Sequence, residues 1–450
     1  MKKSGPAVPP KSPSETTSEL TGAAFLHRLQ PYGADAHLAL AVSGGGDSMG
    51  LLALAAETQK MSYAPRFTVL TVDHGLRPEA AGEAAQVAAA CKRLGVPHVT
   101  LTADAALPDS GIQQQARRLR YRLMAAWCAE HGADALVLAH HRDDQAETVL
   151  MRMARGSGVS GLGGMAPRQT LQTEAGPLLL LRPFLQEAGA TLKALAHAAA
   201  LPVIEDPSNK DEQFERVRWR KLLPLLAAQG LSAERLAAMA EEMRSVQAAL
   251  DKKLTGWLDA YADWHPYGVL CLPRQDFDAL PLAHRQRLLG RFVQYFGGHK
   301  HPLKQKKSDR ALAQIAGQGH GATVLGGALV RWRKAQLFIG REAAACAATT
   351  VASEGDWDHR FRVEAASQNP DLSLAALGAG GVNDLRARGG RFDTAIPAAY
   401  FAALPGVFDG EKLLGCPVLS AEMREVTDFR LSGVYSHTLY RDILRGGQGW

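Results

Sequence analysis

The feature of this sequence that most constrains its fold is an alternation of short apolar runs with helical stretches between His37 and Gly158. The stretches between the runs predict helices, one of which ends at Gly95. The runs are rich in Leu, Val and Ala, which is typical of strands buried on both faces, and they cover residues 37–43, 67–75, 96–103 and 133–141. Such alternation predicts an α/β fold, in which helices cover both faces of a parallel sheet.

Chemically unusual residues accompany the carboxyl ends of three of these predicted strands. They occupy residues 43–48, 73–77 and 140–144. Ligands of open parallel sheets bind at the carboxyl ends of the strands. We therefore expect the binding residues of this chain to come from these three segments.

The sharpest of these segments is a glycine-rich loop between the first predicted strand and its helix. Its residues are Ser43, Gly44, Gly45, Gly46, Asp47 and Ser48. Adjacent glycines let backbone N–H groups approach an anion, and the helix N-terminus beyond them favours phosphate. Phosphate alone would repel a carboxylate, so Asp47 indicates a bridging Mg²⁺. The loop lacks the lysine of a Walker A motif, and the structural alternative is a plain glycine turn.

A second group of candidates accompanies the fourth predicted strand. Asp144 and Glu147 are three residues apart, so they share one helix face and can hold a cation together. Structural explanations exist as well. His140 and His141 can be satisfied structural histidines, and the carboxylates can complement the dipole at a helix start.

Basic residues form two further candidate groups. Arg117 and Arg120 share a helix face and can neutralise developing charge on a phosphate, although such a run is most often a solvated face. A later cluster can contact a phosphate backbone or be a plain surface loop. Its members are Lys300, Lys304, Lys306, Lys307 and Arg310.

The ordered set of motifs resembles the tRNA(Ile)-lysidine synthetases, which belong to the PP-loop ATP pyrophosphatases. The resemblance is strong over residues 38–224, looser to Arg341 and weak in the last hundred residues. It implies a Rossmann-like parallel sheet of the PP-loop type. The motifs that carry it are SGGGDS at 43–48, DHGLRP at 73–78, ARRLRY at 116–121, HHRDDQAET at 140–148, RGSG at 155–158, GLGGM at 161–165, RP at 182–183 and EDPSN at 205–209.

The resemblance implies a two-step reaction on the wobble cytidine of a tRNA(Ile) with a CAU anticodon. ATP first adenylates the C2 oxygen of the cytidine and pyrophosphate leaves. The ε-amine of free L-lysine then attacks C2 and expels AMP, which leaves lysidine in the tRNA. ATP as cosubstrate, Mg²⁺, tRNA(Ile) and free lysine are therefore the expected cofactors and partners.

The resemblance also implies residue roles. Arg120 and Arg117 are expected at the phosphate or the activated base, and His140, Asp144 and Glu147 at the lysine amine. The expected cofactor-binding residues are Ser43, Gly44, Gly45, Gly46, Asp47, Ser48, Asp73 and His74, with Asp47 on the metal. The expected catalytic residues are Asp47, Arg120, His140, Asp144 and Glu147.

Two other functions stay open at this point. One is another PP-loop tRNA-modifying enzyme, such as a thiolase, and the other is a nucleotide-binding or RNA-binding module without chemistry. The five cysteines are scattered and form no CxxC, which argues against sulfur transfer and against a zinc or disulfide framework. An intact Asp47 argues against the module.

Composition sets the remaining expectations. The 450 residues carry a net charge of +6, from 51 Lys and Arg against 45 Asp and Glu, which permits a nucleic-acid partner without demanding one. The chain has no long apolar run and no secretory signal, so we expect a cytoplasmic protein without a membrane span. The oligomeric state is left open, with a homodimer as one option.

The sequence divides into four expected regions. A polar tail rich in Pro and Ser, predicted to be disordered, covers residues 1–22, and the PP-loop catalytic domain covers 23–228. A mainly helical, basic region that would contact tRNA covers 229–342. A small mixed C-terminal domain covers 343–450.

Overall fold

A computed structural model of the chain describes residues 20–73, 75, 79–102, 112–173, 175–205, 211–298, 303–317, 319–346, 348–350, 355–358, 360–365, 372–419 and 430–433. Residues 1–19 of the predicted tail, His74 and Lys300 lie outside this part. Leu20 is buried, and helix α1 begins at Gly22, so residues 20–22 are folded. The chain divides into two compact units, Met1–Arg244 and Ser245–Trp450.

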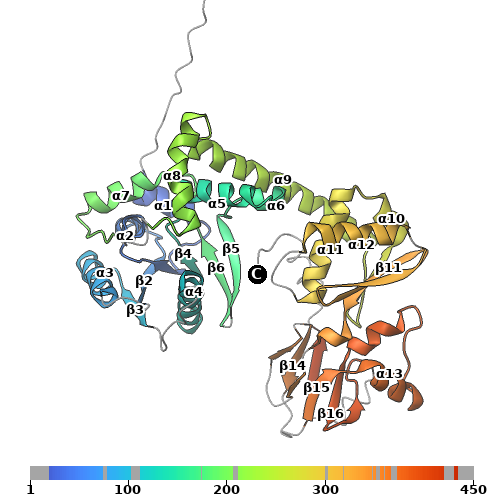
Figure 1. Cartoon of the computed structure of the whole chain (residues 1–450). Coiled ribbons are helices and arrows are strands. Elements are labelled where there is room, and N and C mark those ends of the chain that lie inside the picture. The colour runs from blue at the N-terminus through green and yellow to red at the C-terminus, as the bar shows by residue number, and fades with distance from the viewer. Residues whose placement is uncertain are drawn as a thin grey trace, which may run out of the picture. The chain divides into compact units, whose positions relative to one another are not determined.

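The first unit is an α/β unit around one six-stranded sheet (Figure 1). The strand order is β3-β2-β1-β4-β6-β5, and every neighbouring pair is parallel except β5 with β6. The strands are β1 His37–Ala41, β2 Arg66–Asp73, β3 His98–Thr102, β4 Ala135–Val137, β5 Arg168–Thr173 and β6 Gly176–Leu181. The parallel sheet predicted from the sequence is confirmed, with β5 as an antiparallel strand that the prediction did not include.

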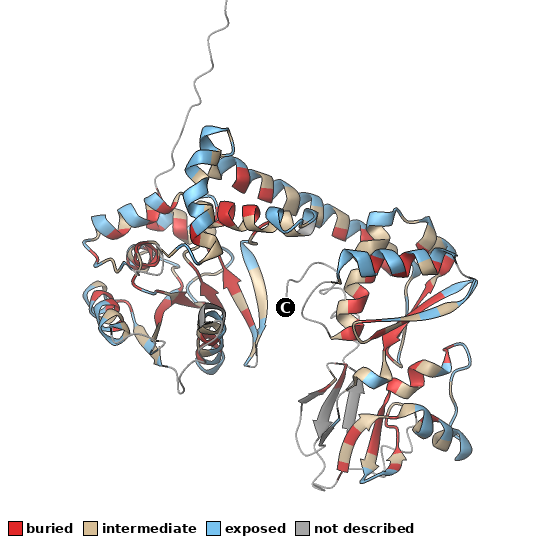
Figure 2. Ribbon diagram, viewed as in Figure 1, coloured by how far each residue is buried: buried red, intermediate tan, exposed pale blue. Residues whose placement is uncertain are grey.

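Helices cover both faces of this sheet. In β1, Leu38 and Leu40 pack into one apolar cluster, while Ala39 between them packs into a cluster on the other face. The alternation follows from the two-residue period of a strand. The helices of this unit are α1 Gly22–Arg28, α2 Gly46–Thr58, α3 Ala80–Leu94, α4 Ile112–Glu130, α5 Arg142–Ala154, α6 Val159–Leu162, α7 Gly189–Ala198 and α8 Glu215–Ala228. Figure 2 shows the sheet as a largely buried layer between more exposed helices.

Helices α2 and α7 pack unusually closely, and this brings α7 to the glycine-rich loop. A Cβ atom on Gly50 of α2 would lie 2.2 Å from the carbonyl oxygen of Leu192 in α7. Such a distance is sterically forbidden, so only glycine fits at this crossing. The close packing places the chain after α7 beside the start of α2.

Helix α9, Ala233–Tyr261, spans the boundary between the two units. The second unit holds a five-stranded antiparallel sheet of β7 Asp263–His265, β8 Val269–Pro273, β11 Gln336–Arg341, β10 Ala328–Trp332 and β9 Gly321–Leu325. Its apolar core is shared with helices α10 Arg274–Ala279, α11 Leu282–Gly297 and α12 Gln305–Gly317.

Two small antiparallel sheets complete the second unit. One contains β12 Thr349–Thr350, β15 Leu372–Ala376, β16 Pro405–Asp409 and β17 Lys412–Gly415, and the other contains β13 Gly355–Trp357, β14 Phe361–Ala365 and β18 Arg430–Gly433. Short helices accompany them, namely η2 Ala343–Ala345, α13 Gly378–Ala387 and η3 Ala398–Ala403. A helical middle followed by a small mixed C-terminal region agrees with the sequence prediction.

Candidate active site

The glycine-rich loop leaves the carboxyl end of β1 and enters α2, as predicted. Gly44 has a φ of +87°, a left-handed conformation that favours glycine. A Cβ atom on Gly44 would lie 2.4 Å from Cδ1 of Ile204, whose backbone N–H donates to the Gly44 carbonyl over 3.0 Å. The segment after α7 therefore packs onto the loop and fixes its shape.

The second serine of the loop, Ser48, forms its hydrogen bonds within the loop. Ser48 is buried, and its hydroxyl donates to the Gly45 carbonyl over 2.8 Å and accepts from the Ser43 backbone N–H over 3.2 Å. Ser48 therefore stabilises the loop from inside. Across the loop, the side chain of Lys193 from α7 lies against Gly46, where a Cβ atom would be 2.9 Å from Lys193 Cγ. Sequence reasoning missed this lysine, because it is remote in the chain and belongs to no motif.

Asp47 lies in the first turn of α2 and faces His141, which follows strand β4. Its Oδ2 atom lies 3.5 Å from Nε2 of His141, and its Oδ1 atom is buried and has no hydrogen-bond partner within the described residues. A buried, unpartnered carboxylate oxygen is costly unless a cation binds it. This atom beside a glycine-lined loop fits Mg²⁺, which binds through one or two carboxylates together with phosphates and water. The described residues contain no group of three or more His, Cys, Asp or Glu side chains that could hold a metal by themselves.

The His141 ring contacts three carboxylates of this site, those of Asp47, Asp143 and Asp144. His141 is the N-cap of α5, and its ring is buried. Nε2 lies 3.4 Å from Asp144 Oδ2, and Nδ1 lies 3.4 Å from Asp143 Oδ2. Burial alone would lower the pKa of His141, but Asp143, Asp47 and Asp144 together raise it to about 10. The structure therefore assigns a charged imidazole to the residue that joins Asp47 to α5, and this partner of Asp47 was missed by sequence reasoning.

His140 has the opposite character. Its Nδ1 atom is buried without a hydrogen-bond partner in the described part of the chain. Burial lowers the pKa of His140 well below the usual range of histidine, and this outweighs the raising effect of Asp144. The arginines Arg182, Arg117 and Arg216 lower it further. His140 is therefore a neutral imidazole with a free nitrogen.

Asp144 and Glu147 share one face of α5, as their spacing predicted, and both bind arginines of α8. Glu147 is fully buried, and its two oxygens accept from Arg216 Nε over 2.5 Å and from Arg220 Nε over 2.7 Å. Asp144 Oδ1 accepts from Arg216 Nη2 over 3.0 Å, and Asp144 Oδ2 caps α5 by accepting from the His141 N–H over 3.1 Å. The contact of Glu147 with a lysine amine stays a prediction, and it requires a guanidinium to give way.

The other predicted residues lie on neighbouring elements. Asp73 ends β2, and its Oδ1 atom accepts from the Gly75 N–H over 2.9 Å, while His74 lies outside the described residues. In α4, Arg120 is half-buried, and Arg117 is exposed and stacks on Tyr121 with 5.0 Å between the guanidinium carbon and the ring centre. Their expected roles beside the nucleotide and the base stay predictions.

Comparisons with known proteins identify the family of this chain. Residues 19–226 match the PP-loop domain family. A tRNA(Ile)-lysidine synthase of Methylobacterium nodulans is 41% identical over 340 residues, which cover 73% of this chain and 98% of that protein. The enzyme of the same name from Ruegeria pomeroyi is 34% identical and covers 85% of this chain and 88% of that protein. A third, from a Bradyrhizobium species, is 39% identical and covers 72% and 96%.

None of the helices in the described part of the chain is long and apolar enough to cross a membrane. Each of the three relatives is matched over most of its own length, and the matched PP-loop domain contains the glycine loop, Asp47 and the residues of α5 described above. The chain belongs to the tRNA(Ile)-lysidine synthase family of PP-loop enzymes.

Proposed function

We propose that this enzyme ligates free L-lysine to C2 of the wobble cytidine in a tRNA(Ile) with a CAU anticodon, at the expense of ATP. The products are lysidine in the tRNA, AMP and pyrophosphate. The observation that carries the proposal is the position of His141, which contacts Asp47 at the glycine loop and Asp144 on α5. This links a phosphate-binding loop directly to an acidic site suited to a cationic substrate.

In the first step, the C2 oxygen of the cytidine attacks the α-phosphorus of ATP. The bond between that phosphorus and the oxygen bridging to the β-phosphate breaks, and its electron pair leaves with pyrophosphate. The N–H groups of Gly44, Gly45 and Gly46 bind the departing phosphates, and Lys193 and the arginines of α4 neutralise charge around them. Asp47 would hold Mg²⁺, which supplies Lewis-acid stabilisation of that charge when bound.

In the second step, the neutral ε-amine of lysine attacks C2. The bond between C2 and the adenylated oxygen breaks, AMP leaves with that oxygen, and the amine loses a proton. Nδ1 of His140 has no partner among the described residues and can accept a hydrogen bond from the amine, while the lowered pKa of His140 makes it a weak final acceptor of the proton. The carboxylate of Asp144 stands next to it and suits the lysine cation, while Glu147 positions Arg216 and Arg220.

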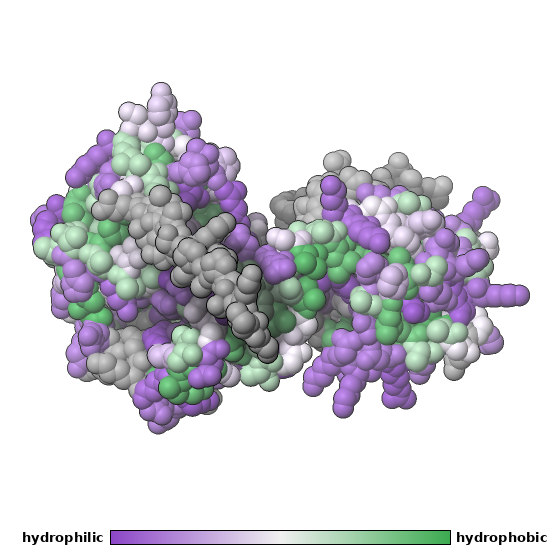
Figure 3. Space-filling model, turned by 90° about the horizontal axis from the view of Figure 1, so that it is seen from above, coloured by the Kyte–Doolittle hydropathy of each residue, from purple (hydrophilic) through white to green (hydrophobic). Residues whose placement is uncertain are grey.

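The tRNA partner is expected to contact exposed cations outside the catalytic unit as well. Figure 3 shows hydrophilic side chains projecting from the second unit. The exposed members of the basic cluster predicted from the sequence lie at and within α12, and they are Lys304, Lys306, Lys307 and Arg310. Their charge suits a phosphate backbone, and such binding weakens as salt rises.

The order of the two steps gives the test. With ATP, Mg²⁺ and the tRNA but no lysine, the enzyme should release pyrophosphate in an amount close to that of the enzyme sites. AMP should appear only when lysine is added. Release of AMP and pyrophosphate together without lysine, or no pyrophosphate with the tRNA present, would contradict the proposal.

A further inference from the structure

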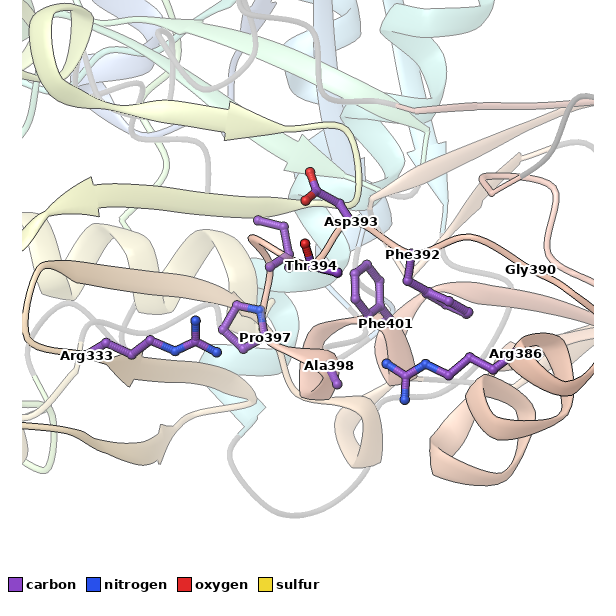
Figure 4. A pocket seen from close by; sticks show the side chains of 10 residues that line it. Arg333, Arg386, Gly390, Phe392, Asp393, Thr394, Pro397, Ala398 and Phe401 are labelled. Atoms are coloured by element: carbon purple, nitrogen blue, oxygen red, sulfur yellow. The ribbon is translucent and has the colours of Figure 1, made fainter.

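The second unit contains a pocket that the proposed chemistry does not use (Figure 4). Its volume is about 340 Å³, close to the lower end of the about 300–1,000 Å³ found for small-molecule sites. It lies where the turn after β10 meets α13, the following loop and η3. We propose that this pocket binds one unpaired nucleotide of the RNA substrate, with a phosphate at each end.

Two guanidinium groups define the ends of the pocket. Arg333 reaches in from the turn after β10 and Arg386 from α13, and Figure 4 shows their guanidiniums pointing toward one another across it. Both side chains are exposed. Within the described part of the chain neither guanidinium has an ion-pair partner, and each lies over an aromatic ring, Arg333 over Phe338 and Arg386 over Phe392. Two guanidinium groups without an ion-pair partner in the described part of the chain therefore face one cavity.

The carboxylate at the rim, Asp393, offsets only part of the charge of the two arginines. Asp393 Oδ2 pairs with His265 Nε2 over 3.0 Å, and Asp393 Oδ1 accepts from the Ala395 N–H over 2.8 Å. Both of its oxygens are thus engaged away from the arginines. Two arginines against one carboxylate leave the lining of the pocket with an excess of positive charge, which favours anions.

Between the arginines the pocket is lined in part by apolar side chains. Ile396 and Pro397 are buried there, and the rings of Phe392 and Phe401 meet edge to face with 4.8 Å between their centres. Apolar and aromatic surfaces of this kind bind the flat faces of nucleobases without regard to sequence. The guanidinium planes of arginine also stack on unpaired bases.

This arrangement selects an internal nucleotide of a single strand. Such a nucleotide has a flat apolar body and one phosphate on its 5′ side and one on its 3′ side, which matches an apolar floor between two cations. A free mononucleotide engages only one arginine with its phosphate. A nucleotide within a duplex keeps its base stacked and paired, so it cannot enter the pocket. The inference rests on the proposed function only in taking a tRNA as the natural ligand.

The test measures binding of a fluorescein-labelled hexauridylate to the full-length protein by anisotropy, at several salt concentrations and with saturating ATP. The double variant Arg333→Ala/Arg386→Ala should raise the Kd about tenfold or more and flatten the salt dependence by about one released counterion. The matched control is Lys334→Ala/Arg391→Ala, which removes two neighbouring exposed cations that do not line the pocket. It should change the Kd less than about twofold, since charges outside the site add only screened attraction.

Further arms identify the occupant. Phe392→Leu, which keeps an apolar side chain but removes the ring, should weaken hexauridylate binding about fivefold or more. Unlabelled hexauridylate should compete far better than AMP or a duplex of equal length. Equal Kd values for the two double variants, or competition by the duplex as strong as by the single strand, would overturn the proposal. Because the probe contains no cytidine and no lysine is present, these results do not depend on lysidine formation.

Discussion

Replacing Glu147 by glutamine tests how the catalytic unit holds its acidic site. In the native protein the fully buried carboxylate of Glu147 binds Arg216 and Arg220, and Arg216 also binds Asp144. A glutamine keeps the size of the side chain and one acceptor oxygen. It removes the negative charge and places an amide NH₂ group against a guanidinium. The variant therefore leaves two cations facing a neutral side chain.

The magnitude follows from burial. Breaking a fully buried ion pair on one side costs about 3–5 kcal/mol, because the other charge is left without a partner. Here the side chains of Arg216 and Arg220 are 37% and 48% exposed, so water compensates part of the loss. We expect Glu147→Gln to lower the free energy of unfolding by about 1–3 kcal/mol, or the melting temperature of this unit by roughly 3–10 °C.

The control is Glu215→Gln in the same helix pair. Glu215 binds Arg155, but both side chains are more than one third exposed, at 36% and 61%. Exposed pairs contribute about 0–1 kcal/mol, so the melting temperature should change by less than roughly 4 °C. Thermal unfolding followed by circular dichroism compares the two variants directly.

Kinetics then distinguish a role of Glu147 in lysine binding from a purely structural role. At a temperature where the variant is folded, Glu147→Gln should raise the lysine KM by roughly tenfold to a hundredfold and leave the ATP KM within about twofold. The reason is that Arg216 loses an anchor and shifts against Asp144, while the glycine loop is untouched. An unchanged lysine KM, or equal loss for ATP and lysine, would refute this account of the α5 carboxylates.

Three other perturbations separate the parts of the site. Asp47→Asn should reduce pyrophosphate release by at least about a hundredfold, because it removes the charge that would hold Mg²⁺. The variant should stay folded, and the loss of the contact with His141 should lower its melting temperature by no more than roughly 4 °C. Retained pyrophosphate release in the folded variant contradicts this. Gly44→Ala should raise the ATP KM about tenfold or more, because a left-handed alanine costs about 1–2 kcal/mol and its Cβ would collide with Ile204. The control Gly95→Ala should leave the ATP KM unchanged, because a Cβ at Gly95 would meet only open space. Iodoacetamide at neutral pH should leave turnover intact, because the thiols are not thiolates at that pH. Burial raises their pKa to about 11 for Cys346 and about 12 for the others. A loss of activity that ATP does not prevent would favour sulfur transfer. The other four thiols are Cys91, Cys128, Cys271 and Cys416.

The sequence predicts those parts of the fold that depend on local pattern. Short apolar runs followed by glycine or polar residues correctly located β1, β2, β3 and β4, because strands buried on both faces have little choice of composition. The antiparallel strand β5, Arg168–Thr173, was not predicted. Its sequence RQTLQT is polar, since it lies at the edge of the sheet with one neighbour, and nothing in its composition distinguishes it from a loop.

In the candidate site, too, local sequence pattern predicted some features, and contacts between distant residues were not predicted. The glycine loop could be found because its function depends on consecutive residues, and the structure gives Gly44 the left-handed backbone that only this pattern supplies easily. The contacts of Asp47 with His141, and of Glu147 with Arg216 and Arg220, join elements far apart in sequence. Residue spacing carries no information about such pairs. Sequence reasoning therefore placed Glu147 at a free cation site, whereas in the fold its charge is already balanced by two arginines.

The most direct test of the central claim is mass spectrometry of the tRNA product. The purified enzyme is incubated with ATP, Mg²⁺, isotopically labelled lysine and a tRNA(Ile) transcript with a CAU anticodon, and the RNA is then digested to nucleosides. We predict a cytidine derivative whose mass has increased by that of one lysine less one water, labelled in full and confined to the wobble position. An unmodified cytidine, or a sulfur-containing nucleoside in its place, would contradict the account.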